Sequence, residues 1–185
     1  MTLWELSILD FIQQHLRCLP MDRLMVIVTT LGNGGAIWVL TGAALLVSRR
    51  TRKLGFSLLI AVGVTAIVCS LGLKPLIARP RPCDVNPAVQ LLISRPTDFS
   101  FPSGHTAASF AAATVLALGH CRYRKAAAAL AVLIAFSRLY LYVHFPTDVF
   151  AGALLGVLLG WCCFTVVRLA FRCRTPIERR NKRCS

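Results

Sequence analysis

Acidic side chains are scarce in this 185-residue sequence, and charged residues of either sign are few. Asp and Glu number 7 against 21 Lys and Arg, and the four types together make up only 15% of the chain. Hydrophobic residues make up 56%, and the mean hydropathy is +0.67. These values lie outside the range of ordinary soluble domains, so they predict an integral membrane protein.

The sequence also lacks patterns that would indicate other classes of protein. No CxxC pair occurs among the eight cysteines, and no spacing of Cys and His is typical of zinc. The positive charge is spread over several clusters beside apolar runs, so nucleic acid is not an expected partner. The first residues lack a basic start, and Glu5 and Asp10 interrupt the apolar region, so no cleaved signal peptide is expected.

Four apolar runs are predicted to cross a bilayer as helices, because a span needs about 20 residues, or somewhat fewer with polar ends. They are residues 54–73, residues 106–119 with the preceding FPSGH in the first turn, residues 126–143 and residues 149–167.

The N-terminal quarter allows two interpretations. Residues 24–48 are apolar but contain LGNGG at 31–35, which breaks helices, so they form one long span or two helices that meet at a turn containing Asn33. Residues 3–17 have apolar side chains near helical spacing, which favours an interfacial or bundle-packed helix. The expected fold is all-α: a single membrane-embedded domain over residues 1–185, with about six helices.

Orientation is predicted from the basic clusters, because short loops rich in Lys and Arg stay in the cytoplasm. The clusters are RRTRK at 49–53, RYRK at 122–125 and a basic tail from about residue 170 to 185, and they fall on one side if the four spans alternate. We therefore expect a multi-pass protein of the cell membrane with a cytoplasmic C terminus. The tail is also expected to contact anionic lipid head groups.

Three polar clusters are then expected together on the extracytoplasmic side. Charged groups at membrane depth are costly and mark functional sites by default. Guanidinium groups can bind phosphate oxygens in pairs, and an ammonium adds a point charge. The residues expected to neutralise a phosphate are Lys74, Arg81 and Arg138.

The stretch FPSGH adds a helix start that suits an anion. Ser103 is a natural N-cap, and Gly104 allows the backbone to approach a ligand closely. The free N–H groups of the first turn carry the positive end of the helix dipole. We expect this turn to hold a phosphate, with His105 at its edge.

The third cluster, SRLYLYVHFPTD, places Asp148 four residues after His144 and across a proline. Asp148 can then hold one imidazole nitrogen while the other faces the phosphate, which makes His144 a credible nucleophile. His105 would protonate the departing oxygen and then take a proton from water. Positive side chains stabilise the negative charge on the equatorial oxygens of the phosphoryl group, so no metal or other cofactor is required.

Other polar residues are given ordinary roles. Arg79 and Arg95 are expected to be interfacial anchors. Loop or helix-cap positions are expected for three aspartates, Asp22, Asp84 and Asp98. His15 and His120 are expected to lie away from the site.

At this point the sequence resembles the phosphatidic acid phosphatase type 2 superfamily, which shares its site with bacterial acid phosphatases and vanadium haloperoxidases. The three signatures span residues 74–148. They are Lys74 with Arg81-Pro82 seven residues on, Pro102-Ser103-Gly104-His105, and Ser137-Arg138 followed by His144 and Asp148.

The resemblance implies a bundle of six membrane helices with a haloperoxidase-like core, metal-independent hydrolysis, and the residue roles given above. Substrates of similar small bacterial proteins include undecaprenyl pyrophosphate, phosphatidylglycerol phosphate and phosphatidic acid, of which the first is favoured. Two rivals are a phosphotransferase that passes the phosphoryl group to another acceptor, and a non-enzymatic lipid or anion translocator.

Overall fold

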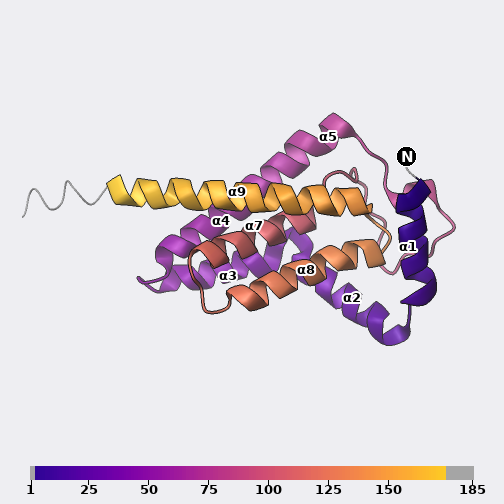
Figure 1. The fold of residues 1–185 in the computed structure, drawn as a ribbon, viewed down its shortest axis with the longest axis horizontal. Helices are drawn as coiled ribbons and strands as arrows, with labels where there is room; N and C mark the ends of the chain where they lie inside the picture. The colour runs from indigo at the N-terminus through magenta and orange to yellow at the C-terminus, as the bar shows by residue number, and fades with distance from the viewer. Residues whose placement is uncertain (1–2, 174–185) are drawn as a thin grey trace, which may run out of the picture.

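The computed structural model describes residues 3–173, and within this range it contains helices and loops but no strand (Figure 1). Seven α-helices within residues 3–173 are longer than ten residues. Their bounds are α1 Leu3–His15, α2 Leu19–Gly32, α3 Ala36–Val47, α4 Arg52–Ile67, α7 Gly104–Leu118, α8 Arg124–Tyr140 and α9 Pro146–Cys173. Shorter elements are the 3₁₀ turn η1 Asn33–Gly35, the π-helical η2 Val68–Leu73, α5 Lys74–Ile77 and α6 Pro82–Val85.

Three helical stretches of the described chain are long and apolar enough to cross a membrane: Leu19–Val47, Arg52–Val85 and Pro146–Phe171. With Leu19–Val47 counted as one helix, the described residues contain six long helices, which confirms the predicted fold class. The predicted spans at 54–73 and 149–167 lie within two of these stretches. The spans expected at 106–119 and 126–143 correspond to α7 and α8, which have 15 and 17 residues, and crossing by these two helices stays a prediction.

Both interpretations of the N-terminal quarter hold in part. The stretch Leu19–Val47 is long enough to span, yet LGNGG divides it into α2 and α3. Gly34 and Gly35 have φ of 58° and 69°, values that glycine adopts readily and other residues rarely do. Helix α1 lies across the end of the bundle instead of running along it (Figure 1) and buries Leu9 and Ile12.

Helices α7 and α9 run side by side and approach each other unusually closely. Three glycines of α9 face the backbone of α7. A Cβ atom on Gly152 would lie 2.7 Å from the carbonyl oxygen of Ser103. The corresponding distances are 2.2 Å from Gly156 to residue 107 and 2.6 Å from Gly160 to residue 111. The facing positions of α7 include Ala107 and Ala111, both fully buried. Small residues on both sides let two backbones pack directly, which is a common basis of helix association in membranes.

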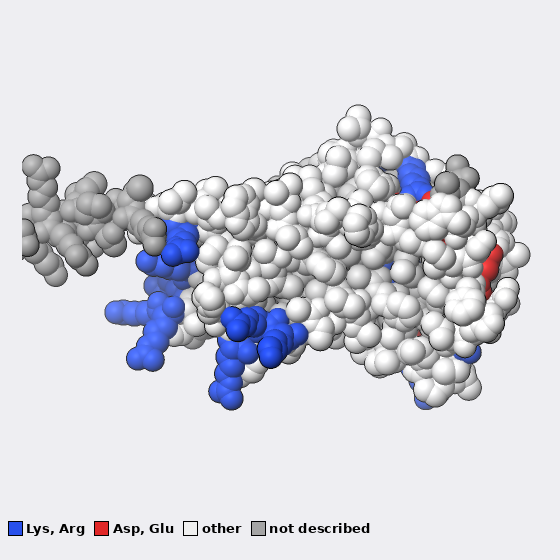
Figure 2. Space-filling model, viewed as in Figure 1, with Lys and Arg blue, Asp and Glu red and all other residues white. Residues whose placement is uncertain are grey.

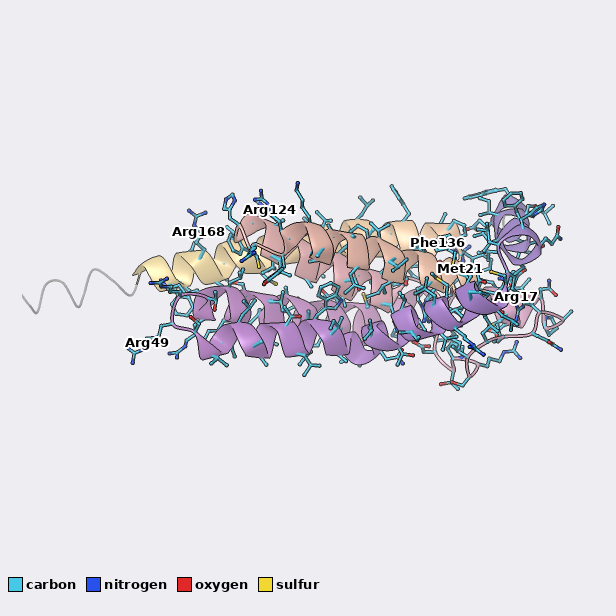
Figure 3. All side chains as sticks on the ribbon, turned by 90° about the horizontal axis from the view of Figure 1, so that it is seen from below. Arg17, Met21, Arg49, Arg124, Phe136 and Arg168 are labelled. Atoms are coloured by element: carbon cyan, nitrogen blue, oxygen red, sulfur yellow. The ribbon has the colours of Figure 1, made fainter. Side chains whose placement is uncertain are left out.

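Exposed Lys and Arg side chains gather near one end of the bundle, and acidic side chains are visible near the other end (Figure 2). Arg49, Arg124 and Arg168 mark the basic end, and Arg17 lies at the opposite end (Figure 3). RRTRK and RYRK therefore lie at the same end of the bundle, as predicted. Most of the predicted basic tail lies outside the described residues.

Replacing Gly156 with alanine is expected to destabilise the protein, because the new Cβ would sit 2.2 Å from the Ala107 carbonyl oxygen. Overpacking of this kind costs about 1–3 kcal/mol. Gly63→Ala is the matched control: Gly63 is also inside a helix, but a Cβ there meets nothing within 4 Å. That variant should be neutral, or more stable by roughly 0.5–1 kcal/mol. Thermal unfolding in detergent measures both, and an unchanged Tm for Gly156→Ala would contradict the packing.

Candidate active site

The three predicted clusters converge on one cavity of about 240 Å³. Lys74 follows the π-helical turn η2, Arg81 caps α6, Gly104 and His105 begin α7, and Arg138 lies in the last turn of α8. The loop between α8 and α9 adds His144. All six of these residues line the cavity, and Arg81 and Arg138 are only 2% and 3% exposed.

The cations of this cavity are held by fixed partners. Arg81 donates from Nη1 to the carbonyl oxygen of Val143 at 2.7 Å and from Nε to that of Asp98 at 2.8 Å. Arg138 donates from Nη1 to the hydroxyl of Thr29. Its Nε, in contrast, is buried without a hydrogen-bond partner in the described chain. A buried unpaired donor is rare and costs about 1–3 kcal/mol, so this atom points to a missing acceptor.

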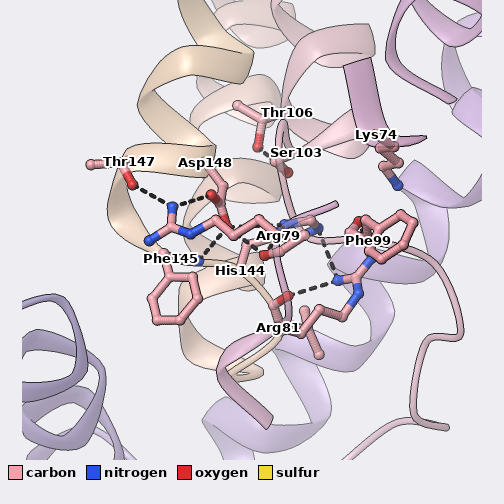
Figure 4. A network of polar contacts seen from close by, with 12 residues as sticks. Lys74, Arg79, Arg81, Phe99, Ser103, Thr106, His144, Phe145, Thr147 and Asp148 are labelled. Atoms are coloured by element: carbon pink, nitrogen blue, oxygen red, sulfur yellow. Dashed lines mark hydrogen bonds and ion pairs between the residues drawn. The ribbon is translucent and has the colours of Figure 1, made fainter. Parts of the chain in front are cut away.

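His144 is 1% exposed, and its two ring nitrogens face different groups. Nε2 lies 3.2 Å from Arg81 Nη1, on the cavity side (Figure 4). Nδ1 lies 3.7 Å from Asp148 Oδ2, which is an ion-pair distance but too long for a direct hydrogen bond. Burial, and after it the positive charges of Arg81, Arg138 and Lys74, hold the pKa of His144 well below its usual value.

A serine that the sequence did not single out links His144 to Asp148. Ser100 is fully buried, donates from its hydroxyl to Asp148 Oδ2, and lies 3.5 Å from His144 Nδ1. Asp148 Oδ2 also accepts the backbone N–H of Phe145 at 2.8 Å. The expected contact between Asp148 and the imidazole is thus shared with Ser100 instead of being made directly.

Asp98 lies in an exposed loop before α7, as expected, but it also lines the cavity, which the sequence did not predict. Its carboxylate forms ion pairs with Lys74 and, at 2.6 Å, with Arg81 Nη2. Partial burial raises the pKa of Asp98, but the hydrogen bond from Lys74 and the charge of Arg81 outweigh it and lower the pKa to about 2. The side chain remains 53% exposed, so an anionic group stands at the open edge of the cavity.

Arg79 was expected to be an interfacial anchor, and the structure shows it in a buried network instead (Figure 4). It donates to Asp148 Oδ1 at 2.5 Å and to Glu5 Oε2 at 2.6 Å, and its guanidinium lies 4.1 Å from the centre of the Phe145 ring. Thr147 donates to the other oxygen of Glu5 at 2.5 Å. Helix α1 is thereby connected to the same carboxylate that faces His144.

Two more expectations need correction. Ser103 stands at the N-cap of α7 as predicted, but its side chain makes no capping bond and accepts a hydrogen bond from the Thr106 hydroxyl at 2.9 Å. Asn33 is part of a turn as expected, yet it also contacts the site: His105 Nε2 lies 2.9 Å from its Oδ1. A Cβ on Gly32 would meet the His105 ring at 2.9 Å, so this glycine leaves room for the imidazole.

The sequence profile of the PAP2 superfamily matches residues 50–172. An undecaprenyl-diphosphatase of Sulfolobus acidocaldarius is 38% identical over 151 residues, which cover 80% of this chain and 70% of that protein. The profile match includes residues 74–148, which carry all three signatures, and the extent of both matches shows the family. The chain belongs to the PAP2 superfamily.

Solved structures agree. LpxE of Aquifex aeolicus superposes with a TM-score of 0.76 at 31% identity, covering 89% of this chain and 96% of that one. A phosphatidylglycerolphosphate phosphatase of Bacillus subtilis superposes with a TM-score of 0.68 at 28% identity, and the superposition covers 92% of this chain and 85% of that one. The protein is a membrane lipid phosphatase of this family.

Arg79→Ala is expected to destabilise the protein by about 2 kcal/mol or more, because it leaves Glu5 and Asp148, 2% and 0% exposed, without their shared cation. Arg95→Ala provides the matched control. Arg95 pairs with Asp84 at 2.9 Å, but both side chains are about half exposed, so its loss should cost less than about 1 kcal/mol. Equal unfolding midpoints for the two variants in a denaturant titration would refute a structural role of the network.

Proposed function

We propose that this protein hydrolyses undecaprenyl pyrophosphate to undecaprenyl phosphate through a phosphohistidine, without a metal ion. The observation that carries the phosphate assignment is the cavity lined by three cationic side chains, Lys74, Arg81 and Arg138. The buried Nε of Arg138, which lacks an acceptor, adds to it. The substrate is supported by similarity to the undecaprenyl-diphosphatase. The phosphatidylglycerolphosphate phosphatase supports a second candidate substrate, phosphatidylglycerol phosphate, and phosphatidic acid is the third.

The reaction begins at His144. With a proton on Nδ1, toward Ser100 and Asp148, the Nε2 lone pair faces the cavity and attacks the terminal phosphorus. The new N–P bond forms as the P–O bond to the leaving group breaks, and His105 donates a proton to the departing oxygen. In the second step His105 takes a proton from water, the resulting hydroxide attacks phosphorus, and the N–P bond breaks to release inorganic phosphate.

The surrounding charges suit both steps. The lowered pKa of His144 keeps its imidazole neutral, and therefore nucleophilic, at neutral pH. Lys74, Arg81 and Arg138 stabilise the negative charge on the equatorial oxygens, and the first turn of α7 at Gly104 adds the positive end of a helix dipole.

A second cavity supports a lipid as the leaving group. It has a volume of about 220 Å³ and shares Lys74, Asp98, Gly104 and His105 with the first. Beyond His105 it continues between α4 and the LGNGG turn, past Val62, Ala66 and Cys69. We assign the phosphoryl group to the first cavity and the start of the lipid to the second, with His105 between them.

The basic end of the bundle is proposed to face the cytoplasm, by the excess of Lys and Arg in its short loops. The catalytic cavity, at the end formed by η2, α6 and the α8–α9 loop, would then face the extracytoplasmic side of the cell membrane, with the C terminus in the cytoplasm.

Phosphate release by the detergent-purified protein in EDTA tests the proposal. Undecaprenyl pyrophosphate, phosphatidylglycerol phosphate and phosphatidic acid are compared in parallel, and the first should be hydrolysed fastest. His144→Ala should lower kcat at least 10³-fold, because removal of a catalytic nucleophile leaves only binding and electrostatic stabilisation.

Each alternative has its own result in this assay. A faster reaction with phosphatidylglycerol phosphate would replace the substrate and keep the mechanism. Survival of activity in His144→Ala would refute the nucleophile. If none of the three lipids releases phosphate, the result would favour a phosphotransferase or a translocator. Detection of a phosphorylated acceptor would identify the phosphotransferase.

Asn33 is expected to act as a positioning residue for His105, since its Oδ1 can only accept and therefore fixes the proton on His105 Nε2. Asn33→Ala should lower kcat about tenfold with little change in KM, the effect of losing roughly one hydrogen bond. Asn33→Asp keeps the acceptor and adds a negative charge that favours the imidazolium form of His105, which is the acid of the first step, so the alkaline limb of the pH profile of kcat/KM should move to higher pH. A merely structural asparagine would leave that limb in place in both variants.

A further inference from the structure

We propose that the basic end of the bundle contains a second phosphate site, which binds the head group of an anionic phospholipid. A cavity of about 340 Å³ lies there, on the face between α4 and α9. Arg50, Lys53 and Arg168 line it, together with apolar side chains. We call it the basic cavity; its apolar lining is Leu54, Phe164, Val167 and Phe171. It shares no residue with the catalytic cavity, and the argument does not depend on the catalytic proposal.

The three cations of the basic cavity have no carboxylate partner among residues 3–173. Every ion pair that the described residues form involves groups at the other end of the bundle. The acidic residues of that range lie in α1, at the start of α2, in or near α6, in the loop before α7 and at the start of α9. They are Glu5, Asp10, Asp22, Asp84, Asp98 and Asp148. A counter-ion for the basic cavity is therefore not supplied by this part of the chain.

The shape of the basic cavity suits an amphiphile better than a free anion. The Lys53 ammonium lies 5.2 Å from the centre of the Phe171 ring, so a cation–π contact holds a point charge beside an apolar wall. Val167 is buried at the base of this wall, and neighbouring Val166 and Leu169 on α9 are 64% and 54% exposed, an apolar surface turned toward lipid. A phosphate can lie against Arg50, Lys53 and Arg168 while its acyl chains follow α9.

A lipid head group also fits the position along the bundle. Arg50, Lys53 and Arg168 lie where the spans Arg52–Val85 and Pro146–Phe171 reach their basic ends, which is the level of lipid phosphates. Each cation near an anionic surface contributes roughly 1 kcal/mol of attraction. If the attraction is only a diffuse effect of positive charge, it does not matter which basic residues at this end supply it. A specific site requires Arg50, Lys53 and Arg168.

The RYRK cluster offers a matched control. Arg122, Arg124 and Lys125 carry the same charge at the same end of the bundle and are exposed, but they do not line the basic cavity. One variant replaces Arg50, Lys53 and Arg168 with glutamine, and the other replaces Arg122, Arg124 and Lys125 with glutamine. None of the six residues belongs to the catalytic cavity, so both variants should still release phosphate from the substrate, which verifies their fold.

Binding of phosphatidylglycerol to the detergent-purified full chain is measured by native mass spectrometry, with phosphatidylcholine and inorganic phosphate as comparison ligands. The cavity variant should bind phosphatidylglycerol at least tenfold more weakly than the wild type, and the RYRK variant should stay within about twofold. Lipid bound at the catalytic cavity contributes equally to both variants and cancels in their comparison.

Three results would overturn the proposal. Equal losses in the two variants would show a diffuse attraction without a site. Equal binding of phosphatidylcholine and phosphatidylglycerol by the wild type would show that the charge of the lipid is not recognised. Full displacement of phosphatidylglycerol by millimolar inorganic phosphate would show a free-anion site.

Discussion

The direct backbone contact between α7 and α9 is the constraint on which the site depends. Three glycines at intervals of four residues leave α9 without a side chain at the points of contact, so its backbone lies against Ala107 and Ala111. At the end of that line the N–H of Ser103 donates to the carbonyl oxygen of Asp148 at 3.1 Å. This bond joins the starts of the two helices and fixes the register between two signatures whose bonded residues, Ser103 and Asp148, are 45 positions apart in sequence.

Charge balance within the site limits the repulsion among its cations. Lys74, Arg81 and Arg138 lie close together, and their mutual repulsion must be offset within a protein interior that screens weakly. Asp98 neutralises two of them at the cavity edge. The two arginines of RPRP have different partners. Arg81 faces the cavity and contacts His144. Arg79 instead donates to Glu5 and to Asp148, the carboxylate beside His144.

The sequence predicted what is encoded locally and missed what depends on distant contacts. Helical spacing, breakers and the three signatures were sufficient to place Lys74, Arg81, Gly104, His105, Arg138 and His144 around one cavity. Ser100, Thr29 and Glu5 were missed because each meets its partner 44 to 109 residues away, and an isolated Ser, Thr or Glu carries no pattern. The α7–α9 contact had a signal, the glycine repeat at 152, 156 and 160, which becomes meaningful only once its small-residue partner helix is known.

The partners of the active-site charges differ in how easily they can move. Arg81 is tied by backbone carbonyls of Val143 and Asp98 and is almost fully buried, so its guanidinium is already oriented. The Asp98 carboxylate is half exposed, and its ion pairs are with the side chains of Lys74 and Arg81. In the proposed reaction, the phosphate would therefore replace the carboxylate of Asp98 and leave the cations in place. Such an exchange of one anion for another avoids reorganising the charges that stabilise the transition state, which is how preorganised electrostatic sites lower a barrier.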